Sequence, residues 1–389
     1  MRRLALLLLF GSGLRAAEDR LAAIHALLVP MRAVAIADAR GATPALTAVK
    51  HQLRDWIESH LAHLQWKDAR WAPSPTVLQE QLNDELSRAG LFCPPNETCW
   101  EDRLGYLDRI MLEIQSGFVV VRTSIGLQIC GTDDSAYIYE STDNHWRRMW
   151  QSEQNNYEEK NYFPQRLVEV KISRTDWRPN SDHTEHLVVT TGVLPWCTSV
   201  WQPVYYRVWQ TKSTYSNQLL LLEGSEQADI AAPIHVRANQ HDVFIEFQII
   251  ADDAMRVSEL RHYVLENGRL RRTDPVALTP QDFVSFWLRH PWTEVSEWTA
   301  QTSRATLEAW RKRYKGTDSE FTSPTRHCTR HPDLWQVATD PGSDPDVHYF
   351  LIRAHPPFRF TMVSASDRPW PDCTEDDPAV DNTPDFFDK

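Results

Sequence analysis

The sequence predicts a mainly β protein with a helical N-terminal region, in which four-stranded antiparallel sheets recur in a β-propeller-like arrangement. Three observations support this class: leucines recur at helical spacing before residue 90, short aromatic-rich runs follow residue 104, and four hairpins of similar design occur along those runs. A β-sandwich or a set of open antiparallel sheets, in an α+β fold, is the alternative, because strands of those folds also come as hairpins.

The first residues have the pattern of a secretory signal peptide. Met1-Arg2-Arg3 is basic, the run from Leu4 to Phe10 has no polar residue, and Gly11 follows. This apolar run has seven residues, whereas a membrane-spanning helix needs roughly 20. We therefore expect residues 1–17 to be removed, no membrane span, and an extracytoplasmic location, periplasmic or secreted.

Residues 18–103 are expected to form a helical region, beginning with a helix over 18–38. Thr43-Pro44 and Ser74-Pro75 each combine a helix N-cap with a first-turn proline, which predicts two further helices. Gly90 is expected to end the last of them. Their apolar faces comprise Leu46, Val49, Leu53, Ile57, Leu61 and Leu64, and then Leu78, Leu82 and Leu86.

Residues 104–366 are expected to form the repeated β domain, because each hairpin joins an aromatic-rich strand to a second apolar strand through a polar turn. The hairpins pair residues 136–140 with 146–150, 204–209 with 219–222 through a turn near 213–217, 261–265 with 269–273, and 348–352 with 358–363. Each hairpin is expected to follow another strand, at 127–130, 187–191, 243–250 and 334–338 respectively. The first three of these strands are expected to follow a further strand each, at 118–122, 167–173 and 234–237. Four-stranded sheets repeated radially form a β-propeller.

Two segments depart from the repeat. A helical insertion is expected over 279–316, where Thr279-Pro280 begins a helix and Gly316 ends the last one. The acidic, proline-bearing tail over 367–389 lacks apolar periodicity, so we expect it to lie extended over the surface.

Cysteines in an exported chain indicate disulfide bonds. Cys93 and Cys99 enclose a turn and form the easiest local pair, whereas Cys130 and Cys197 end equivalent strands and are compatible with a bridge between sheets. Cys373 would anchor the tail. The candidates are Cys93, Cys99, Cys130, Cys197, Cys328 and Cys373, and their pairing stays open.

A metal site is not expected around Cys328, although His327 and His331 are near it. Pro324 and Pro332 bracket this stretch, which favours a loop held by a disulfide over a zinc site. The sequence also has no zinc-protease signature, serine elbow or phosphate loop, so it gives no positive indication of metal-dependent or nucleophilic catalysis.

The loops between the second and third strands of the units carry the candidate ligand-binding residues. Carboxylates that converge on one face would bind Ca²⁺ as a cofactor or supply the acid and base of glycoside hydrolysis. Solvated turn residues are the alternative, since Asp is favoured in turns. The candidates are Asp133, Asp134, Trp196, Trp201, Asp252, Asp253, Asp344 and Asp346.

Composition restricts the class of partner. The net charge of −12 argues against nucleic acid, where a basic face is expected. The 16 tryptophans suit either a β-sheet core or a sugar-binding surface. We expect an exported binding protein that presents the loop face to a ligand or protein partner. The alternatives are a carbohydrate-active hydrolase that uses loop carboxylates and Trp platforms, and a structural envelope-associated protein.

Overall fold

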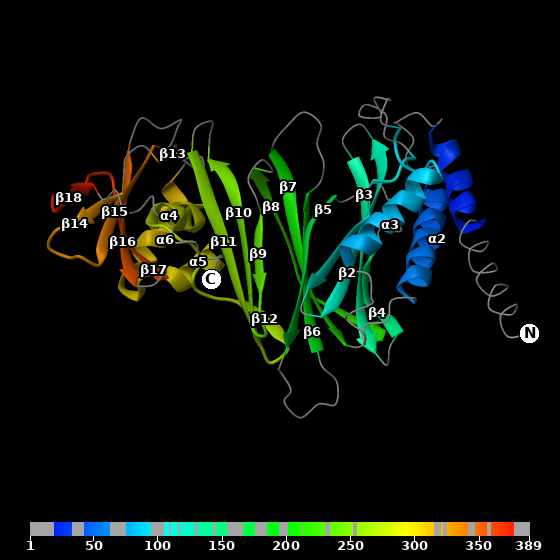
Figure 1. Ribbon diagram of the computed structural model, residues 1–389. Helices are drawn as coiled ribbons and strands as arrows, with labels where there is room; N and C mark the ends of the chain where they lie inside the picture. The colour runs from blue at the N-terminus through cyan, green and yellow to red at the C-terminus, as the bar shows by residue number, and fades with distance from the viewer. Residues whose placement is uncertain are drawn as a thin grey trace, which may run out of the picture. The chain divides into compact units, whose positions relative to one another are not determined.

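The computed structural model shows a mainly β chain with helices at its N-terminal end (Figure 1). The chain forms two compact units, Met1–Glu226 and Gln227–Lys389. The structure describes residues 19–32, 43–62, 75–94, 105–108, 110–115, 117–128, 131–142, 145–153, 166–175, 185–193, 201–212, 214–229, 234–251, 255–314, 320–321, 325–340, 347–355 and 359–376.

The predicted helical region is confirmed in the first unit. A helix covers residues 19–31, and α2 (Thr43–Leu61) and α3 (Pro75–Arg88) follow. Gly90 has a φ of +67°, a conformation that glycine adopts without steric cost, and it lies just beyond the end of α3. The predicted end of the first helix, residues 33–38, lies outside the described residues.

Sheet A is an antiparallel meander in the order β1-β2-β3-β4. Its strands are β1 (Met111–Gln115), β2 (Phe118–Gln128), β3 (Gly131–Thr142) and β4 (His145–Ser152). The prediction of separate strands at 118–122 and 127–130 was wrong, because residues 118–128 form one strand. Thr123 and Ser124 resemble turn residues in sequence, but Thr123 is buried and the Ser124 hydroxyl donates to Asp134 of the neighbouring strand.

Sheet B has the order β5-β6-β7-β8 and completes the first unit. Its strands are β5 (Arg166–Thr175), β6 (Glu185–Val193), β7 (Trp201–Lys212) and β8 (Thr214–Asp229). The predicted strands at 167–173 and 187–191 are confirmed. The predicted turn near 213–217 was too long, because β8 already begins at Thr214.

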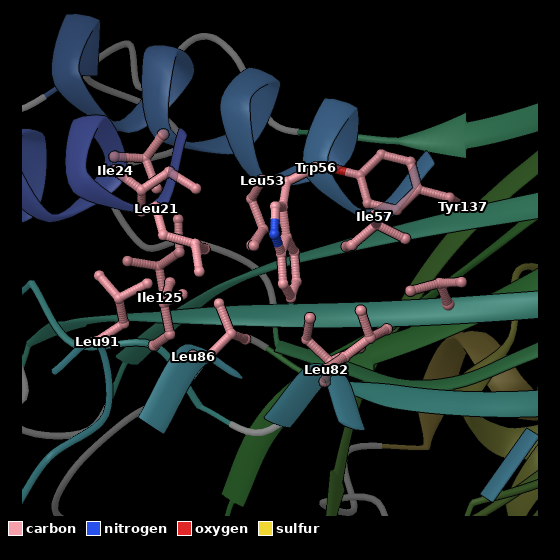
Figure 2. Close-up of a cluster of buried hydrophobic side chains, with 14 of the residues drawn as sticks. Leu21, Ile24, Leu53, Trp56, Ile57, Leu82, Leu86, Leu91, Ile125 and Tyr137 are labelled. Carbon is pink, nitrogen blue, oxygen red and sulfur yellow. The ribbon is translucent and has the colours of Figure 1, made fainter. Parts of the chain in front are cut away.

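Alternation along β2 and β3 explains how sheet A is buried on both faces. Val119, Val121 and Tyr137 belong to the cluster formed with the helices, which Figure 2 shows around Trp56. The intervening residues, including Phe118, Val120, Ala136 and Ile138, pack with sheet B residues such as Val170, Ile172 and Val188. The first unit is therefore built of three layers: helices, sheet A and sheet B.

The second unit contains sheet C, in the order β12-β11-β10-β9. Its strands are β9 (His235–Ala238), β10 (Asp242–Ala251), β11 (Met255–Glu266) and β12 (Arg269–Arg272). Asn267 and Gly268 both have positive φ, at 51° and 75°, as a two-residue hairpin turn with the right twist requires. The third predicted hairpin is thereby confirmed.

The segment predicted as a helical insertion contains α4 (Pro280–Arg289), α5 (Trp292–Val295) and α6 (Arg304–Arg313). Short 3₁₀ turns at Ser296–Trp298 and Gln301–Ser303 connect α5 to α6. The Thr279 side chain accepts a hydrogen bond from the backbone N–H of Asp282, as expected of an N-cap. Aromatic residues of α4 form a core with sheet D side chains such as Phe350 and Met362.

Sheet D comprises six strands, with the main path β17-β16-β15-β14-β18 and β13 paired to β15. They are β13 (Glu320–Phe321), β14 (Arg326–Cys328), β15 (Leu334–Asp340), β16 (His348–His355), β17 (Arg359–Ser366) and β18 (Cys373–Asp376). The predicted hairpin of the fourth unit is confirmed by the pairing of β16 with β17.

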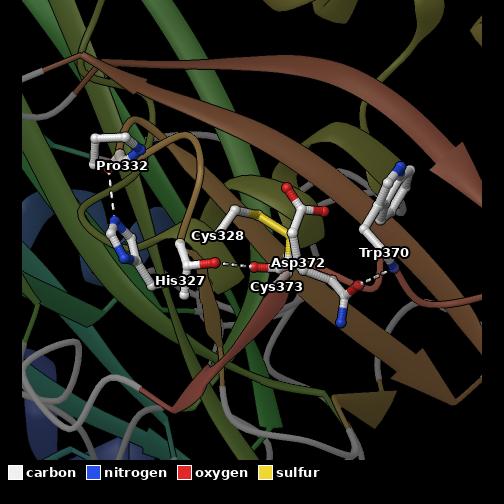
Figure 3. Close-up of a disulfide and its surroundings, with 8 residues drawn as sticks. His327, Cys328, Pro332, Trp370, Asp372 and Cys373 are labelled. Carbon is white, nitrogen blue, oxygen red and sulfur yellow. Dashed lines mark hydrogen bonds between the residues drawn. A yellow bond between two sulfur atoms is a disulfide. The ribbon is translucent and has the colours of Figure 1, made fainter.

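A disulfide joins Cys328 of β14 to Cys373 of β18 across the sheet (Figure 3). The loop predicted around Cys328 was wrong, because β14 gains strand neighbours on both sides, β15 and β18. Cys373 therefore holds β18 to β14, and the rest of the predicted tail, residues 377–389, lies outside the described residues.

The described residues thus form repeated antiparallel sheets, three of four strands and one of six. Their closure into a propeller-like ring stays a prediction.

Candidate functional site

Helix α2 places three charged side chains in one row beside its apolar face. Lys50, Arg54 and Glu58 are four residues apart, so they lie on the same side of the helix. Each makes an ion pair with sheet A or with the residue that follows β4. We call these three residues and their partners, Asp133, Glu153 and Arg148, the charge ladder.

The first pair of the charge ladder is buried, and in the second pair Arg54 is 14% exposed and Glu153 1% exposed. The Nζ of Lys50 is 2.8 Å from the Oδ2 of Asp133, and these side chains are 0% and 1% exposed. The Nη1 of Arg54 donates to Glu153 at 2.8 Å, and the Tyr137 hydroxyl donates to the same carboxylate oxygen at 2.7 Å. Burial raises the pKa of Tyr137 well above its usual value, and Glu153 adds to this effect. These pairs fix α2 against the sheet.

The third pair of the ladder lies where the interface opens to solvent. The Nη1 of Arg148 donates to the Oε1 of Glu58 at 2.5 Å, and the Tyr139 hydroxyl lies 3.4 Å from the same oxygen. Glu58 is 37% exposed and Arg148 is 19% exposed. Burial raises the pKa of Tyr139 well above its usual value, and the Glu58 carboxylate adds to this effect.

A pocket of about 320 Å³ adjoins this third pair, and we call it the α2–β4 pocket. Such a volume is at the lower end of the range for small-molecule sites. Its polar side chains come from α2 and from neighbouring strands of sheet A, and Trp146 and Leu61 supply apolar surface. The lining residues are Glu58, Leu61, Tyr139, Trp146, Arg147 and Arg148.

The charged residues that line the α2–β4 pocket are Glu58, Arg147 and Arg148. Glu58 compensates Arg148, and Arg147 lies 3.7 Å from the carboxylate of Glu140, its partner on β3. The pocket therefore offers both donors and acceptors without a large net charge. Because these groups project from a helix and a sheet that share one core, their relative positions are well fixed.

The structure does not place Asp133 and Asp134 on a loop, so that prediction was wrong. Both residues lie within β3, and Asp133 is buried in the charge ladder. The Asp134 carboxylate accepts from the Ser124 hydroxyl at 2.6 Å and from the backbone N–H of Leu167 at 2.7 Å. Burial raises the pKa of Asp134. These carboxylates connect structural elements of the first unit.

The other predicted ligand-binding residues are not brought together by described parts of the chain. Trp201 is the first residue of β7. Trp196, Asp252, Asp253, Asp344 and Asp346 lie outside the described residues. Within the described residues, no group of three metal-ligating side chains is suitable for a metal ion. A Ca²⁺ site on the loop face stays a prediction.

The remaining cysteines are only partly described. Cys93 is disulfide-bonded. The structural description does not extend to Cys99, Cys130 and Cys197, so their predicted pairings stay predictions.

A second group of charged residues lies inside the second unit, between β11 and the helical insertion. Glu259 and Arg261 are each 1% exposed and pair with each other, and Arg289 pairs with Glu259. Burial lowers the pKa of His290 to about 4, so this ring is neutral at pH 7. Burial acts to raise the pKa of Glu294, but its hydrogen bond with His290 and the charge of Arg272 lower it to about 2. This network holds α4 and α5 against sheet C.

Sequence reasoning missed the charge ladder and the pocket. The available signal was the four-residue spacing of Lys50, Arg54 and Glu58, directly adjacent to the apolar row that predicted the helix. On an isolated helix these three charged side chains would face solvent, so their spacing alone does not predict partners. The tyrosines at alternate positions of β3, Tyr137 and Tyr139, were the one sign that polar groups face this row of charges.

Comparisons with known proteins leave the family open. No protein-family model and no curated protein sequence matches the chain. Two solved structures show weak similarity, one described as an RGII complex of BT0996 and one as a glycoside hydrolase. Each is 10% identical, with 66% of this chain and 72% of the other covered, at TM-scores of 0.25 and 0.24. Values this low do not identify a shared fold.

The described helices include no candidate membrane span. None of them is sufficiently long and apolar to cross a bilayer.

Proposed function

We propose that this protein is an extracytoplasmic binding protein whose ligand occupies the α2–β4 pocket. The observation that carries this proposal is the combination, in one open pocket, of the Trp146 indole with the solvent-accessible ion pair of Glu58 and Arg148. Binding sites for small molecules typically combine aromatic surface with a few fixed polar groups.

The buried part of the charge ladder supports a binding role. The pairs of Lys50 and Arg54 hold α2 in register with sheet A, so Glu58 is positioned before a ligand arrives. Preorganised groups lose little conformational entropy on binding, which favours affinity. The same contacts would be unnecessary if α2 served only to cover an apolar sheet face.

The lining of the pocket favours binding over hydrolysis. Glycoside hydrolysis requires two carboxyl groups at a set separation on either side of the scissile bond. Among the lining residues that the structure describes, Glu58 is the one carboxylate, and Arg148 engages it. We therefore propose that the pocket retains its ligand unchanged.

The covalent structure supports an extracytoplasmic location. The Cys328–Cys373 disulfide links two strands of sheet D, and Cys93 is also disulfide-bonded. Disulfides persist mainly in oxidising compartments. The N-terminal pattern of a basic stretch followed by a short apolar run is in keeping with export.

The test is a binding screen on the mature protein by differential scanning fluorimetry, followed by calorimetry of each hit. A ligand that binds the native state raises the melting temperature by mass action. Trp146→Ala and Arg148→Met should each abolish the shift for a ligand of this pocket.

The matched control is Arg207→Met, which removes an Arg–Glu pair on β7 and β8, far along the chain from the pocket. The control should retain the shift. Binding that survives both pocket variants would refute the proposed site, and release of a cleaved product would refute a purely binding role.

A further inference from the structure

We infer that the α2–β4 pocket binds a small ligand through a carboxylate group, with Arg147 as the residue that receives this group. The inference rests on the proposed function and specifies the chemical class of its ligand. It depends on the charges of the lining residues, on the loose contact between Arg147 and Glu140, and on the geometry of a guanidinium group.

The residues that line the pocket carry one positive charge in excess. Glu58 and Arg148 form a close pair, with their charged atoms 2.5 Å apart, and Arg147 is the third charged lining residue. Burial raises the pKa of Tyr139 well above its usual value, so its hydroxyl carries no charge at neutral pH. An excess of one sign in a pocket raises the local concentration of ions of the opposite sign. The lining therefore favours an anion.

Arg147 is the more accessible of the two arginines. Its side chain is 45% exposed, whereas that of Arg148 is 19% exposed. The Nη2 of Arg147 lies 3.7 Å from the Oε2 of Glu140, which is longer than a hydrogen bond. Ion pairs between exposed groups contribute little free energy, because water screens them. Glu140 is therefore a weak competitor for a ligand that reaches Arg147.

The position of Glu140 leaves Arg147 accessible from the pocket. Glu140 belongs to β3 and faces Arg147 across the strand pair, and it is not among the residues that line the pocket. A ligand carboxylate that enters the pocket meets Arg147 without first displacing the Glu140 side chain. The pair of Glu58 and Arg148 stays intact, since the ligand takes no group from it.

The guanidinium group and the nearby acids favour a carboxylate over other ions. A planar guanidinium forms two parallel hydrogen bonds with a carboxylate. A phosphate monoester accepts bonds in the same way, but at neutral pH it carries nearly two negative charges, and Glu58 and Glu140 would repel both. An ammonium group would meet the excess positive charge of the lining. A single carboxylate gains Arg147 with the least repulsion.

The experiment compares matched probes on the mature protein by calorimetry and by saturation-transfer NMR. Benzoate, hexanoate and gluconate carry one carboxylate on an aromatic, an aliphatic and a hydroxylated body. Benzamide, hexanamide and gluconamide have the same bodies without the charge. Phenyl phosphate and benzylamine present a dianion and a cation.

We expect at least one carboxylate to bind at least about tenfold more tightly than its amide, a difference of about 1.4 kcal/mol, and more tightly than phenyl phosphate or benzylamine. Arg147→Met should weaken this binding at least about tenfold. Arg147→Lys keeps the charge without the planar fork and should weaken it less. Glu140→Gln removes the competing carboxylate and should tighten binding, which loss of a merely structural contact would not do.

The matched control is the pair of Arg271 and Glu266 on β12 and β11, whose side chains are 58% and 49% exposed. Arg271→Met and Glu266→Gln make the same chemical changes in the second unit and should leave carboxylate binding unchanged. A melting curve for each variant separates lost binding from lost folding.

The other outcomes separate the inference from the proposed function. Preferred binding of an amide, of phenyl phosphate or of benzylamine, with loss in Trp146→Ala and Arg148→Met, would overturn the carboxylate inference and leave a binding protein. Carboxylate binding that only Arg147→Met retains would have the same meaning. Binding of no probe would overturn the carboxylate inference, and binding that all three variants retain would overturn the proposed site as well.

Discussion

The buried pair of Lys50 and Asp133 allows a quantitative test of the charge ladder. The two charged atoms are 2.8 Å apart and the side chains are 0% and 1% exposed. At this distance and an effective dielectric constant of about 20, two unit charges attract by on the order of 6 kcal/mol. Desolvation costs several kcal/mol for each ion, so the intact pair adds little net stability, whereas one charge alone is strongly destabilising.

We expect Lys50→Met or Asp133→Val alone to lower the free energy of unfolding by about 3–5 kcal/mol, because each leaves a buried charge without its counter-ion. The double variant removes both charges and should be more stable than either single variant. Urea denaturation of the four proteins yields the coupling energy, and hydrogen exchange of α2 and β3 amides shows where stability is lost.

The control is the pair of Lys312 and Glu308, which are 2.7 Å apart but 73% and 36% exposed. Lys312→Met should change the free energy of unfolding by less than about 0.5 kcal/mol, because water screens exposed pairs. If the losses of Lys50→Met and Asp133→Val simply add in the double variant, the two residues do not act as a pair and the reasoning fails.

Three further predictions concern residues outside the ladder. Burial raises the pKa of Asp282 to about 7, above its unfolded value of about 4, so stability should fall as the pH rises from about 4 to about 7, by up to about 4 kcal/mol. Thermal melts across this range should show a flatter profile for Asp282→Asn, and an unchanged profile would contradict the assignment. Replacing Cys328 and Cys373 by Ala should cost about 4 kcal/mol in urea denaturation, given their sequence separation of 45; a loss below about 1 kcal/mol would argue against the chain-entropy account. A Cβ at Gly192 would collide with the Tyr205 hydroxyl oxygen, so Gly192→Ala should lower the melting temperature, at a cost of about 1–3 kcal/mol. Gly117→Ala, where no atom lies within 4 Å but φ is +88°, separates steric conflict from backbone strain.

Local patterns in the sequence were sufficient for most of the β architecture. Aromatic-rich runs and polar turns identified the hairpins because hydrophobic alternation is a property of neighbouring residues. The errors arose where a partner strand changed the environment. Thr123 and Ser124 have turn-like side chains, yet β3 satisfies Ser124 and keeps β2 continuous through both residues. Likewise, β15 and β18 flank β14 and make a strand of a segment bracketed by prolines.

The candidate site was less predictable for a related reason. Two adjacent aspartates usually indicate a turn, because the side chain competes for local hydrogen bonds. In β3 the same residues point to opposite faces, where Asp133 meets Lys50 of a helix and Asp134 meets Leu167 of the next sheet. The sequence separation from Lys50 to Asp133 is 83 residues. No local pattern contains that information, although the charged row on α2 signals that some partner is required.

Side-chain amides form hydrogen bonds with backbone groups at the edges of the sheets. These bonds help the pocket to keep its shape. The Asn83 side chain of α3 donates to the Ile110 carbonyl at 3.0 Å and accepts from the Ile110 N–H at 2.8 Å, as a neighbouring strand would. Gln115 of β1 does the same for β5, donating to Val170 at 2.8 Å and accepting from Ile172 at 3.1 Å. Edge strands closed in this way resist pairing with other chains.

These bonds also connect the layers of the first unit through β1. Asn83 joins the helices to sheet A, Gln115 joins sheet A to sheet B, and the charge ladder holds α2 to β3. A shift of α2 that would separate Glu58 from Arg148 must therefore also break buried polar contacts, and each broken contact carries the desolvation cost of its groups. The geometry of the pocket is consequently a property of the whole unit, and ligand binding there should stabilise sheet A and the helices together.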